Sequence, residues 1–96
     1  MSEKQEAKRM GARLGKNSGR GMIKGDAFWK HFTVDFKEAS KSFTLNKDVW
    51  SKAVTDALKN RNDPMIVVVL GEGQQTVRLA IMELELVEQW EDNNGK

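Results

Sequence analysis

The residues best suited to chemistry lie between Asp26 and Lys37, where two carboxylates and an amine stand at the ends of one extended segment. Asp35 and Lys37 are two residues apart, and in a strand the side chains at positions i and i+2 share a face. Asp26 stands at the beginning of the segment, directly after Gly25. Two acidic oxygen donors and an ammonium group that converge on one point are what metal-assisted phosphodiester cleavage requires. We therefore treat Asp26, Asp35 and Lys37 as candidate catalytic residues.

The alternation of apolar and polar residues predicts a strand that would hold Asp35 and Lys37 rigidly. From position 29 to position 37 the sequence alternates as a half-buried strand does. The predicted apolar face holds Phe28, Phe32, Val34 and Phe36. The other face holds Trp29, His31, Thr33, Asp35 and Lys37. On that second face His31 is either a catalytic candidate or a neutral surface residue, and Trp29 either covers the sheet edge or stacks on a base.

The same residues also have an ordinary structural explanation. An acid-any-lysine tripeptide occurs by chance roughly 0.7 times in a chain of this length, and residues 6–8 are a second match. A solvated strand face that carries an ion pair would show the same pattern. Asp26 and Asp35 can meet only if the chain turns between them. A hairpin around residues 27–30 would provide that turn, and it would shorten the predicted strand.

Length and composition limit the class of protein. A chain of 96 residues predicts one domain over 1–96 with a single core. The absence of cysteine excludes a disulfide framework, a thiolate metal site and a cysteine nucleophile. The longest apolar run, 65–70, is too short to span a bilayer, and the charged N-terminus does not resemble a secretory signal. We expect no membrane partner and a location in the cytoplasm of a cell or of an infected host.

Positive charge is concentrated in the N-terminal third of the chain. Residues 1–30 carry eight basic and three acidic side chains, a net charge of +5, whereas the remainder carries eight basic and eleven acidic ones, a net charge of −3. Residues 11–25 contain five glycines and predict a flexible loop. Such a basic arm is either a solvated tail or a binding surface for a polyanion. The residues expected to contact DNA are Arg13, Lys16, Ser18, Arg20 and Lys24.

The rest of the sequence predicts an α/β domain in which helices flank a mixed sheet, in the order α-β-β-β-α-β-β. The expected elements are a helix over 2–10, a short strand at 22–23, the strand over 29–37, an extended piece at 42–45, a helix that follows Asn46 and ends before Pro64, and strands over 65–70 and 76–82. Residues 83–91 are amphipathic and predict a short helix or an edge segment. Residues 92–96 predict a frayed tail.

Several of these motifs occur in an order that is typical of one nuclease superfamily. The residues concerned are Glu3, Gly11, Ser18-Gly19, Gly25-Asp26, Asp35-Phe36-Lys37, Ser42-Phe43-Thr44-Leu45, Trp50 and Pro64-Met65-Ile66-Val67. In these residues the chain resembles the PD-(D/E)XK nucleases, and within them the small phage-encoded endonucleases related to Holliday junction resolvases. The likeness covers about residues 3–82 and implies a restriction-endonuclease-like core. The chain departs from the pattern at Asp35, where close relatives usually have glutamate, and at Gly25, which replaces a proline.

The resemblance implies a set of metal ligands and a role for the lysine. The implied ligands for Mg²⁺ or Mn²⁺ are Asp26, Asp35, the backbone carbonyl of Phe36 and, from the first helix, Glu3. Glu6 competes with Glu3 for the place on that helix. Lys37 would orient the attacking water or stabilise the transition state as a point charge. The products would carry a 5′-phosphate and a 3′-hydroxyl.

The resemblance also implies a function, a substrate and an assembly. We expect a magnesium-dependent endonuclease that selects branched DNA and acts in phage recombination or DNA processing. The alternatives are a catalytically inactive DNA-binding accessory protein with the same fold, and a nuclease for flaps, nicks or single-stranded DNA. Symmetric cutting of two strands needs two active sites, so a C₂ homodimer is a further expectation. Its interface would lie within residues 76–90.

Overall fold

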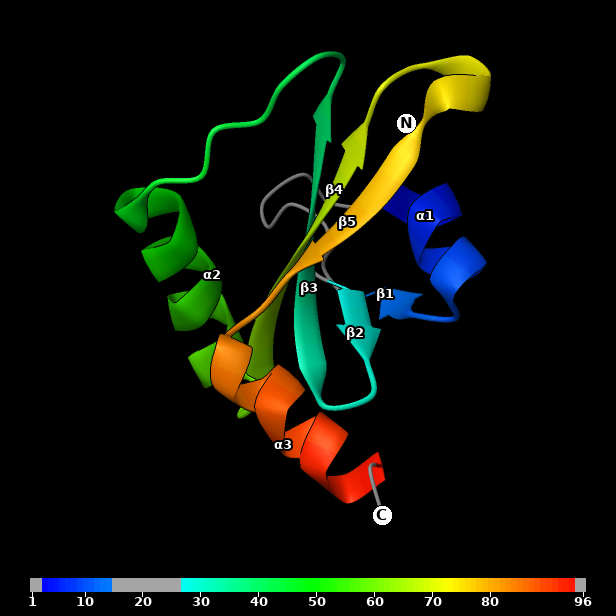
Figure 1. Ribbon diagram of the computed structural model, residues 1–96. Helices are drawn as coiled ribbons and strands as arrows, with labels where there is room; N and C mark the ends of the chain where they lie inside the picture. The colour runs from blue at the N-terminus through cyan, green and yellow to red at the C-terminus, as the bar shows by residue number, and fades with distance from the viewer. Residues whose placement is uncertain (1–2, 15–26, 95–96) are drawn as a thin grey trace.

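The computed structural model describes residues 3–14 and 27–94. In these ranges the chain forms three α-helices, a short 3₁₀ turn and a five-stranded sheet (Figure 1). The elements in chain order are α1 (Glu3–Met10), β1 (Arg13–Leu14), β2 (Ala27–Trp29), β3 (Phe32–Ala39), α2 (Lys47–Lys59), β4 (Asp63–Leu70), the turn η2 (Gly73–Gln75), β5 (Val77–Ile81) and α3 (Leu84–Asn94). The predicted α/β class, with a mixed sheet and flanking helices, is confirmed.

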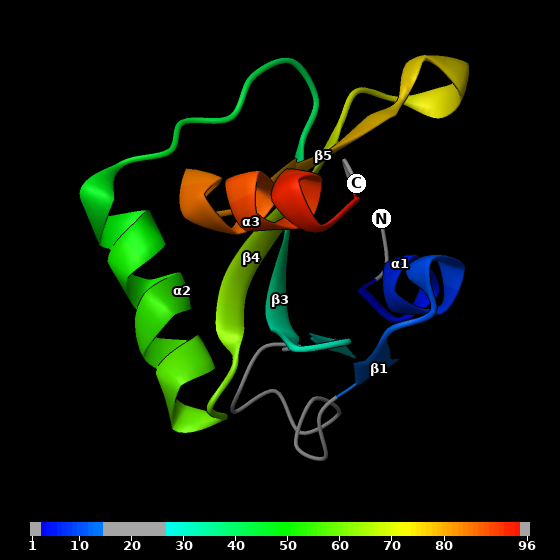
Figure 2. The same ribbon diagram turned by 60° about the horizontal axis from the view of Figure 1, so that its bottom comes forward.

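The sheet combines antiparallel hairpins with one parallel pair. Its strand order is β1-β2-β3-β4-β5, and only β3 and β4 run parallel to each other. A parallel pair requires a crossover connection, and α2 provides it. Figures 1 and 2 show α2 on one side of β3 and β4 and α1 on the other. The two faces of β3 therefore meet different helices.

β4 is buried along most of its length, as the apolar run in the sequence predicts. Residues 64–69 are buried without interruption. Met65 and Val67 belong to a cluster on the α1 side, whereas Ile66 and Val68 belong to a cluster on the α2 side. Both faces of β4 are covered, which explains why its sequence does not alternate.

The second helix begins where the sequence predicts. The side chain of Asn46 accepts a hydrogen bond of 2.9 Å from the backbone N–H of Val49, which caps α2. Ala53 and Ala57 are buried against the sheet. The next apolar residue, Leu58, is not part of this contact, because it is 69% exposed. The line of contact with the sheet runs along positions 49, 53 and 57, and Leu58 is turned about 100° away from it.

The first helix also ends at its predicted residue. Gly11 has a φ of +79°, and its backbone N–H donates to the carbonyl of Lys8. A residue in this left-handed conformation is a common helix stop, and glycine adopts it without strain. Arg13 and Leu14 then form β1, so the predicted loop over 11–25 contains a short strand at its beginning. Residues 15–25 and the strand expected at 22–23 lie outside the described residues.

The single strand predicted over 29–37 is wrong, because the chain turns within it. β2 and β3 form a hairpin whose turn consists of Lys30 and His31, and Lys30 has a φ of +55°. His31 therefore lies in the turn and not on a strand face. Its Nε2 is 3.5 Å from Asp63 Oδ2. The alternative that the sequence left open, a hairpin that shortens the strand, is the observed one.

The turn also changes which side chains of β2 face the core. Residues directly opposite each other in an antiparallel pair share a face. Trp29 lies opposite Phe32, and the two rings stack with their centroids 6.1 Å apart. Phe28 lies opposite Thr33 on the other side of the sheet. The predicted faces of Phe28 and Trp29 are thus exchanged, while the alternation within β3 is as predicted.

Two predictions for the connecting and C-terminal segments also need correction. Residues 42–45 form an irregular connection rather than a strand, and Phe43 packs against the cluster on the α2 side. The segment after β5 is a helix, α3, and it extends to Asn94 rather than fraying from position 92. Within 3–14 and 27–94 every helix is too short or too polar to cross a bilayer.

Candidate active site

Asp35 and Lys37 lie on the face of β3 that is turned toward α2. In the parallel register they stand beside Ile66 and Val68, which pack with Ala53 of α2. Lys37 Nζ is 3.3 Å from Asp35 Oδ2, and the two side chains are 37% and 19% exposed. A partly buried carboxylate and an accessible amine therefore meet at this point. The side chain of Phe36, between them in the chain, is buried on the opposite face.

The C-terminal end of α2 is attached to the start of β3 by two amide side chains. The Nδ2 groups of Asn60 and Asn62 donate to Thr33 Oγ1, at 3.4 Å and 3.1 Å. The helix runs back along the strand, because it connects two parallel strands. One helical turn spans about 5.4 Å and two strand residues span about 6.6 Å. One helical turn back from Asn60 leads to Asp56, and two residues along the strand from Thr33 lead to Asp35. Asp56 therefore lies level with Asp35.

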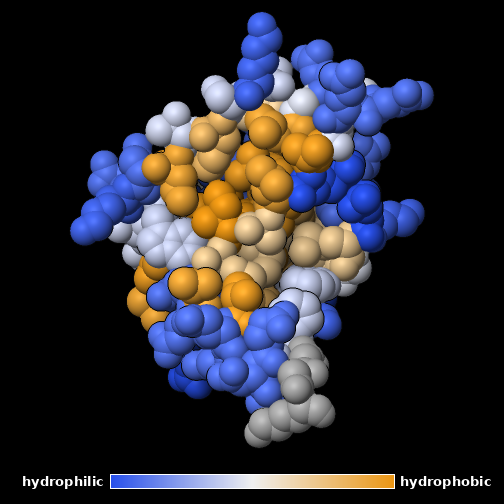
Figure 3. Space-filling model, in the orientation of Figure 1, coloured by the Kyte–Doolittle hydropathy of each residue, from blue (hydrophilic) through white to orange (hydrophobic). Residues whose placement is uncertain are grey.

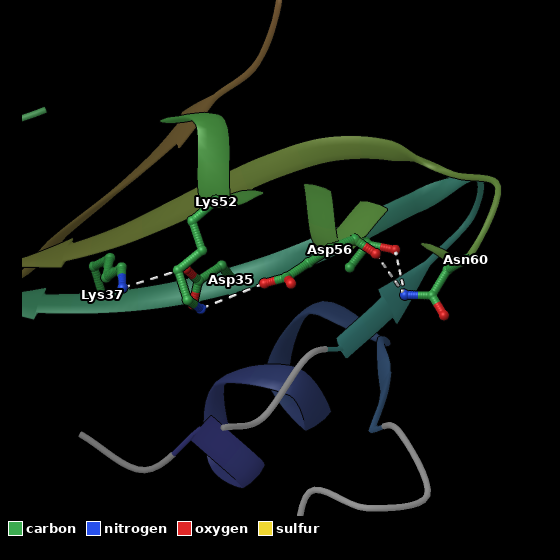
Figure 4. Close-up of polar contacts among 6 residues, drawn as sticks. Asp35, Lys37, Lys52, Asp56 and Asn60 are labelled. Atoms are coloured by element: carbon green, nitrogen blue, oxygen red, sulfur yellow. Dashed lines mark hydrogen bonds and ion pairs between the residues drawn. The ribbon is translucent and has the colours of Figure 1, made fainter. Parts of the chain in front are cut away.

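The same step brings Lys52 level with Lys37. Lys52 Nζ is 3.4 Å from Asp56 Oδ2 on the same helix. Figure 4 shows Lys52 reaching from α2 toward the strand, where its amine lies between the carboxylates of Asp35 and Asp56 in this view. We call this group of four residues, Asp35, Lys37, Lys52 and Asp56, the charged seam. It is formed by one strand and one helix that face each other.

The charges of the seam balance, and its contacts are of a kind that can exchange. Two carboxylates face two ammonium groups, with N–O contacts of 3.3–3.4 Å. A lysine ammonium is a compact charge on a flexible stem, so it gives way more readily than a bidentate arginine does. A metal cation can compete with an amine for a carboxylate, and the displaced amine can bind a phosphate oxygen. The arrangement therefore suits a phosphodiester and a cation together.

Asp26 lies outside the described residues. Ala27, which follows it in the chain, is the first residue of β2 and lies opposite Val34. The described pairing of β2 with β3 ends at that point, while β3 continues to pair with β4 through Ala39. Among residues 3–14 and 27–94, no three His, Cys, Asp or Glu side chains gather as a metal site would need.

The two glutamates considered on the first helix lie on the other side of the sheet. α1 packs through Ala7 against the apolar face of β3, opposite the seam. Glu3 is the first residue of that helix, so its backbone lies across the sheet from Asp35. Glu6 accepts hydrogen bonds from Arg78 of β5, at 2.8 Å from Nε and 3.2 Å from Nη2. Glu6 is therefore engaged elsewhere, and the expectation that it competes for a place beside Asp35 is corrected.

The contact between Glu6 and Arg78 changes the titration of both groups. The hydrogen bond from Arg78 lowers the pKa of Glu6, although burial acts in the opposite direction. The same hydrogen bond raises the pKa of Arg78. Each partner thus holds the other in its charged form. The pair stabilises the attachment of α1 to β5.

One of the expected DNA contacts can be placed relative to the seam. Arg13 of β1 lies opposite Phe28, and its guanidinium carbon is 5.9 Å from the centre of that ring. Because Phe28 lies opposite Thr33, Arg13 shares the side of the sheet that carries Asp35. The other expected contacts, Lys16, Ser18, Arg20 and Lys24, lie outside the described residues.

A hollow of about 500 Å³ lies on the opposite side of the sheet. It is lined by Glu6, Glu38, Ala39, Ser40, Val69, Gly71, Glu72, Gly73, Thr76 and Arg78. Gly71 closes it at the end of β4, where a Cβ would come within 2.8 Å of the Gln75 carbonyl. Of the acids that line this hollow, Glu6 is already held by Arg78. We therefore place the candidate active site at the seam.

Sequence reasoning missed Lys52 and Asp56. Their spacing on the predicted helix shows that they share a side of it. The spacing alone does not show that this side faces Asp35, because the alignment of α2 with β3 also depends on its packing on the sheet and on the contacts of Asn60 and Asn62 with Thr33. A right-handed strand-helix-strand unit would have indicated only that the helix covers this face of the sheet.

Comparison with known proteins gives no match among protein-family models, curated proteins or solved structures. The family resemblance therefore rests on the sequence motifs alone.

Proposed function

We propose that this protein is a metal-dependent endodeoxyribonuclease of the PD-(D/E)XK type, with its active site at the charged seam. The observation that carries the proposal is the contact of 3.3 Å between Asp35 and Lys37 on one partly buried strand face. Lys52 and Asp56 add a second amine and a second acid beside them. We further propose branched DNA as the substrate and phage recombination or DNA processing as the setting.

The strand arrangement supports a restriction-endonuclease-like core. A helix, a hairpin and a parallel strand-helix-strand unit follow one another, and β3 belongs to both the hairpin and the parallel unit. The acid-any-lysine tripeptide lies on this shared strand, just beyond the described pairing with β2.

We propose that Asp26 is the second acid of the site. Asp26 directly precedes Ala27 in the chain, and Ala27 lies opposite Val34, the residue before Asp35. Opposite residues in such a pair have Cα atoms about 4.5–5.5 Å apart and share a face. The distance along the chain therefore permits the convergence that the sequence predicted.

The donor atoms proposed for the site suit a hard divalent cation. Carboxylates of Asp26 and Asp35 and the carbonyl of Phe36 offer oxygen only, which Mg²⁺ and Mn²⁺ prefer. The position of α1 gives no support to Glu3 as a further ligand, whereas Asp56 comes from the helix that does face Asp35. When bound, the ion supplies an activated water and neutralises charge on the phosphate.

The side chains of the seam then have separate tasks. Lys37 is held next to Asp35, so its amine can orient a water or stabilise negative charge on the phosphate. Lys52 brings a second ammonium from α2, and Asp56 positions it. Arg13, on the same side of the sheet, can hold a neighbouring phosphate of the DNA backbone.

The proposal is tested by incubating the protein with supercoiled plasmid and with labelled duplex, flap, single-stranded and four-way DNA. Cleavage in Mg²⁺ but not in Ca²⁺, and its loss in Asp35→Asn, are expected. Binding to DNA without cleavage in either Mg²⁺ or Mn²⁺ would favour the inactive accessory protein. A preference for flaps or single strands over four-way DNA would overturn the branched substrate and leave the active site in place.

A further inference from the structure

The outer edge of β5 is an apolar surface without a strand beside it in the described part of the chain. β5 is the last strand of the sheet, and Val77 and Leu79 are 48% and 49% exposed. Figure 3, in the orientation of Figure 1, shows hydrophobic surface across the middle of this side of the molecule, with hydrophilic residues around it. An edge of this kind is a ready template for another strand.

β5 lacks the features that usually protect an edge strand. Its five residues include no proline and no lysine, and its single charge, Arg78, is held by Glu6 on the α1 side. The opposite edge of the described sheet, β1, has only two residues and carries an exposed Arg13. Short, charged edges discourage pairing, whereas longer apolar ones favour it. The two edges therefore differ in the property that decides association.

The exposed side chains continue an apolar face that is otherwise covered. Val77, Leu79 and Ile81 lie opposite Leu70, Val68 and Ile66 of β4, on the α2 side of the sheet. α2 covers Ile66 and Val68 through Ala53. The cover does not extend over the β5 part of this face, where Val77 and Leu79 remain half exposed.

We propose that a second copy of this chain occupies this edge, with the two β5 strands paired antiparallel about a two-fold axis at Leu79. Leu79 then lies opposite Leu79 of the second copy, Arg78 opposite Ala80, and Val77 opposite Ile81. All five residues of the strand are paired in this register. The two sheets become one continuous sheet, and the three apolar side chains of each strand form one row.

Two properties determine this register: the face of the sheet on which each side chain lies, and the position of the charged Arg78. An axis perpendicular to the sheet keeps each face on its own side, so a shift by one residue would place apolar side chains opposite polar ones. Of the registers that keep the faces matched, a pairing centred at position 78 brings the two Arg78 side chains together, and like charges directly opposite are unfavourable. A pairing centred at position 80 leaves Val77 and Arg78 unpaired. The pairing centred at Leu79 avoids both defects, so the edge is complementary to itself.

The proposal can be tested without DNA or metal, so its outcome is independent of the proposed nuclease activity. Sedimentation equilibrium of the full chain over a wide range of concentrations is expected to show a reversible dimer. Leu79→Lys would weaken the dimer at least about 100-fold, because two ammonium groups would meet where apolar surface was buried. The matched control is Leu58→Lys, a change at an exposed leucine of α2, which would leave the dimer intact.

Three further variants test the register. Ala80→Glu would strengthen the dimer at low salt, since it places a carboxylate opposite Arg78 of the second copy, and Ala80→Arg would weaken it. The chain contains no cysteine, so Leu79→Cys would form a disulfide-linked dimer on oxidation, as paired strand positions allow. Circular dichroism checks that each variant is folded.

A wild-type chain that stays monomeric at every concentration would overturn the proposal and point to a strand from a different protein. A dimer that survives both Leu79→Lys and Ala80→Arg would overturn it as well. If the proposed function also holds, the same dimer presents two seams to one branched DNA.

Discussion

Two charged groups on opposite faces of the same sheet differ in how firmly they are held. On the α1 side, Arg78 contacts Glu6 through two hydrogen bonds of 2.8 and 3.2 Å, and the Glu6 side chain is only 11% exposed. On the α2 side, Lys37 contacts Asp35 at 3.3 Å and Lys52 contacts Asp56 at 3.4 Å. An arginine that donates two hydrogen bonds to one carboxylate is held in a defined geometry. A lysine ammonium is a compact charge on a flexible stem, so its contact with a carboxylate is less constrained.

The comparison separates a structural ion pair from a set of groups that can act on a ligand. Glu6 and Arg78 connect the first helix to the last strand, and both carboxylate oxygens of Glu6 accept hydrogen bonds from Arg78. The seam groups keep both charges accessible and can exchange one partner for another. Both sites pair a cation with a carboxylate, but the contacts of the seam are longer and come from lysine rather than arginine.

The largest expected effect is a loss of DNA cleavage when Asp35 or Lys37 is replaced. Asp35→Asn or Lys37→Met should lower Mg²⁺-dependent cleavage by about 1,000-fold or more, because each removes a charge at the reacting phosphate. DNA binding should remain largely intact. Plasmid nicking under single-turnover conditions measures the first quantity, and fluorescence anisotropy in Ca²⁺ measures the second.

The matched control for this prediction is Glu6→Gln, which removes an acid from the other face. It should cleave DNA at nearly the wild-type rate. Equal loss of cleavage in Glu6→Gln and Asp35→Asn would show that the two faces are not functionally distinct. Undiminished nicking by Asp35→Asn would remove the seam as the active site.

A smaller effect is expected at the helix side of the seam. Lys52→Met should lower kcat by about 10- to 100-fold with little change in KM, since its amine would act mainly on charge that develops in the transition state. Lys52→Arg should recover part of the rate, and Asp56→Asn should lose less than Lys52→Met. Lys59→Met is the control, because Lys59 is an exposed lysine in the last turn of the same helix. Equal rates for the Lys52→Met and Lys59→Met proteins would exclude Lys52 from the site.

The next effect concerns the basic residues that are expected to contact DNA. Arg13→Gln together with Arg20→Gln should weaken DNA binding about tenfold and reduce the salt slope of log K by about 1 to 2, whatever the DNA sequence. Binding titrations at several salt concentrations measure both quantities. A salt slope unchanged from the wild type would mean that this arm does not contact phosphates.

The smallest effect is a change in stability on the α1 side. Glu6→Gln should lower the melting temperature at neutral pH by a few degrees, because a partly exposed ion pair contributes modestly. The contact lowers the pKa of Glu6 from its ordinary value of 4.5. Its stabilisation is therefore fully present above pH 4.5 and is lost as the pH falls through the lower folded-state value. Melting curves of the two proteins should converge in acid, and a difference that persists there would argue against the ion pair as its cause.

The sequence predicted the features that depend on local pattern. The cap at Asn46, the stop at Gly11, the buried run in β4 and the alternation within β3 all depend on neighbouring residues, and all are observed. The hairpin was not predicted as the leading arrangement, because Lys30-His31 lacks the Asn-Gly type of turn signal. Hydrophobic alternation continued across the turn and therefore placed Trp29 and Phe28 on the wrong faces.

Part of the candidate site was also predictable, because it depends on residues that are close in the sequence. Asp35 and Lys37 are two residues apart on one strand, so their shared face follows from strand geometry alone. Lys52 and Asp56 meet them only through contacts between residues that are 27 and 29 positions apart, those of Asn60 and Asn62 with Thr33. The apolar positions of α2 indicate which side of the helix meets the sheet, but the alignment of Lys52 with Lys37 also depends on these distant contacts.

The amide contacts at Thr33 also bear on how this protein can change during evolution. Each residue inserted into or deleted from a helix rotates the helical residues before it by about 100° relative to those after it. A single insertion between Lys52 and Asn60 would thus turn Lys52 away from the strand. The site would be disrupted although all four residues of the seam remained in the sequence. In this helix, replacements on the outer surface should be tolerated by natural variants, whereas changes in length should be rare.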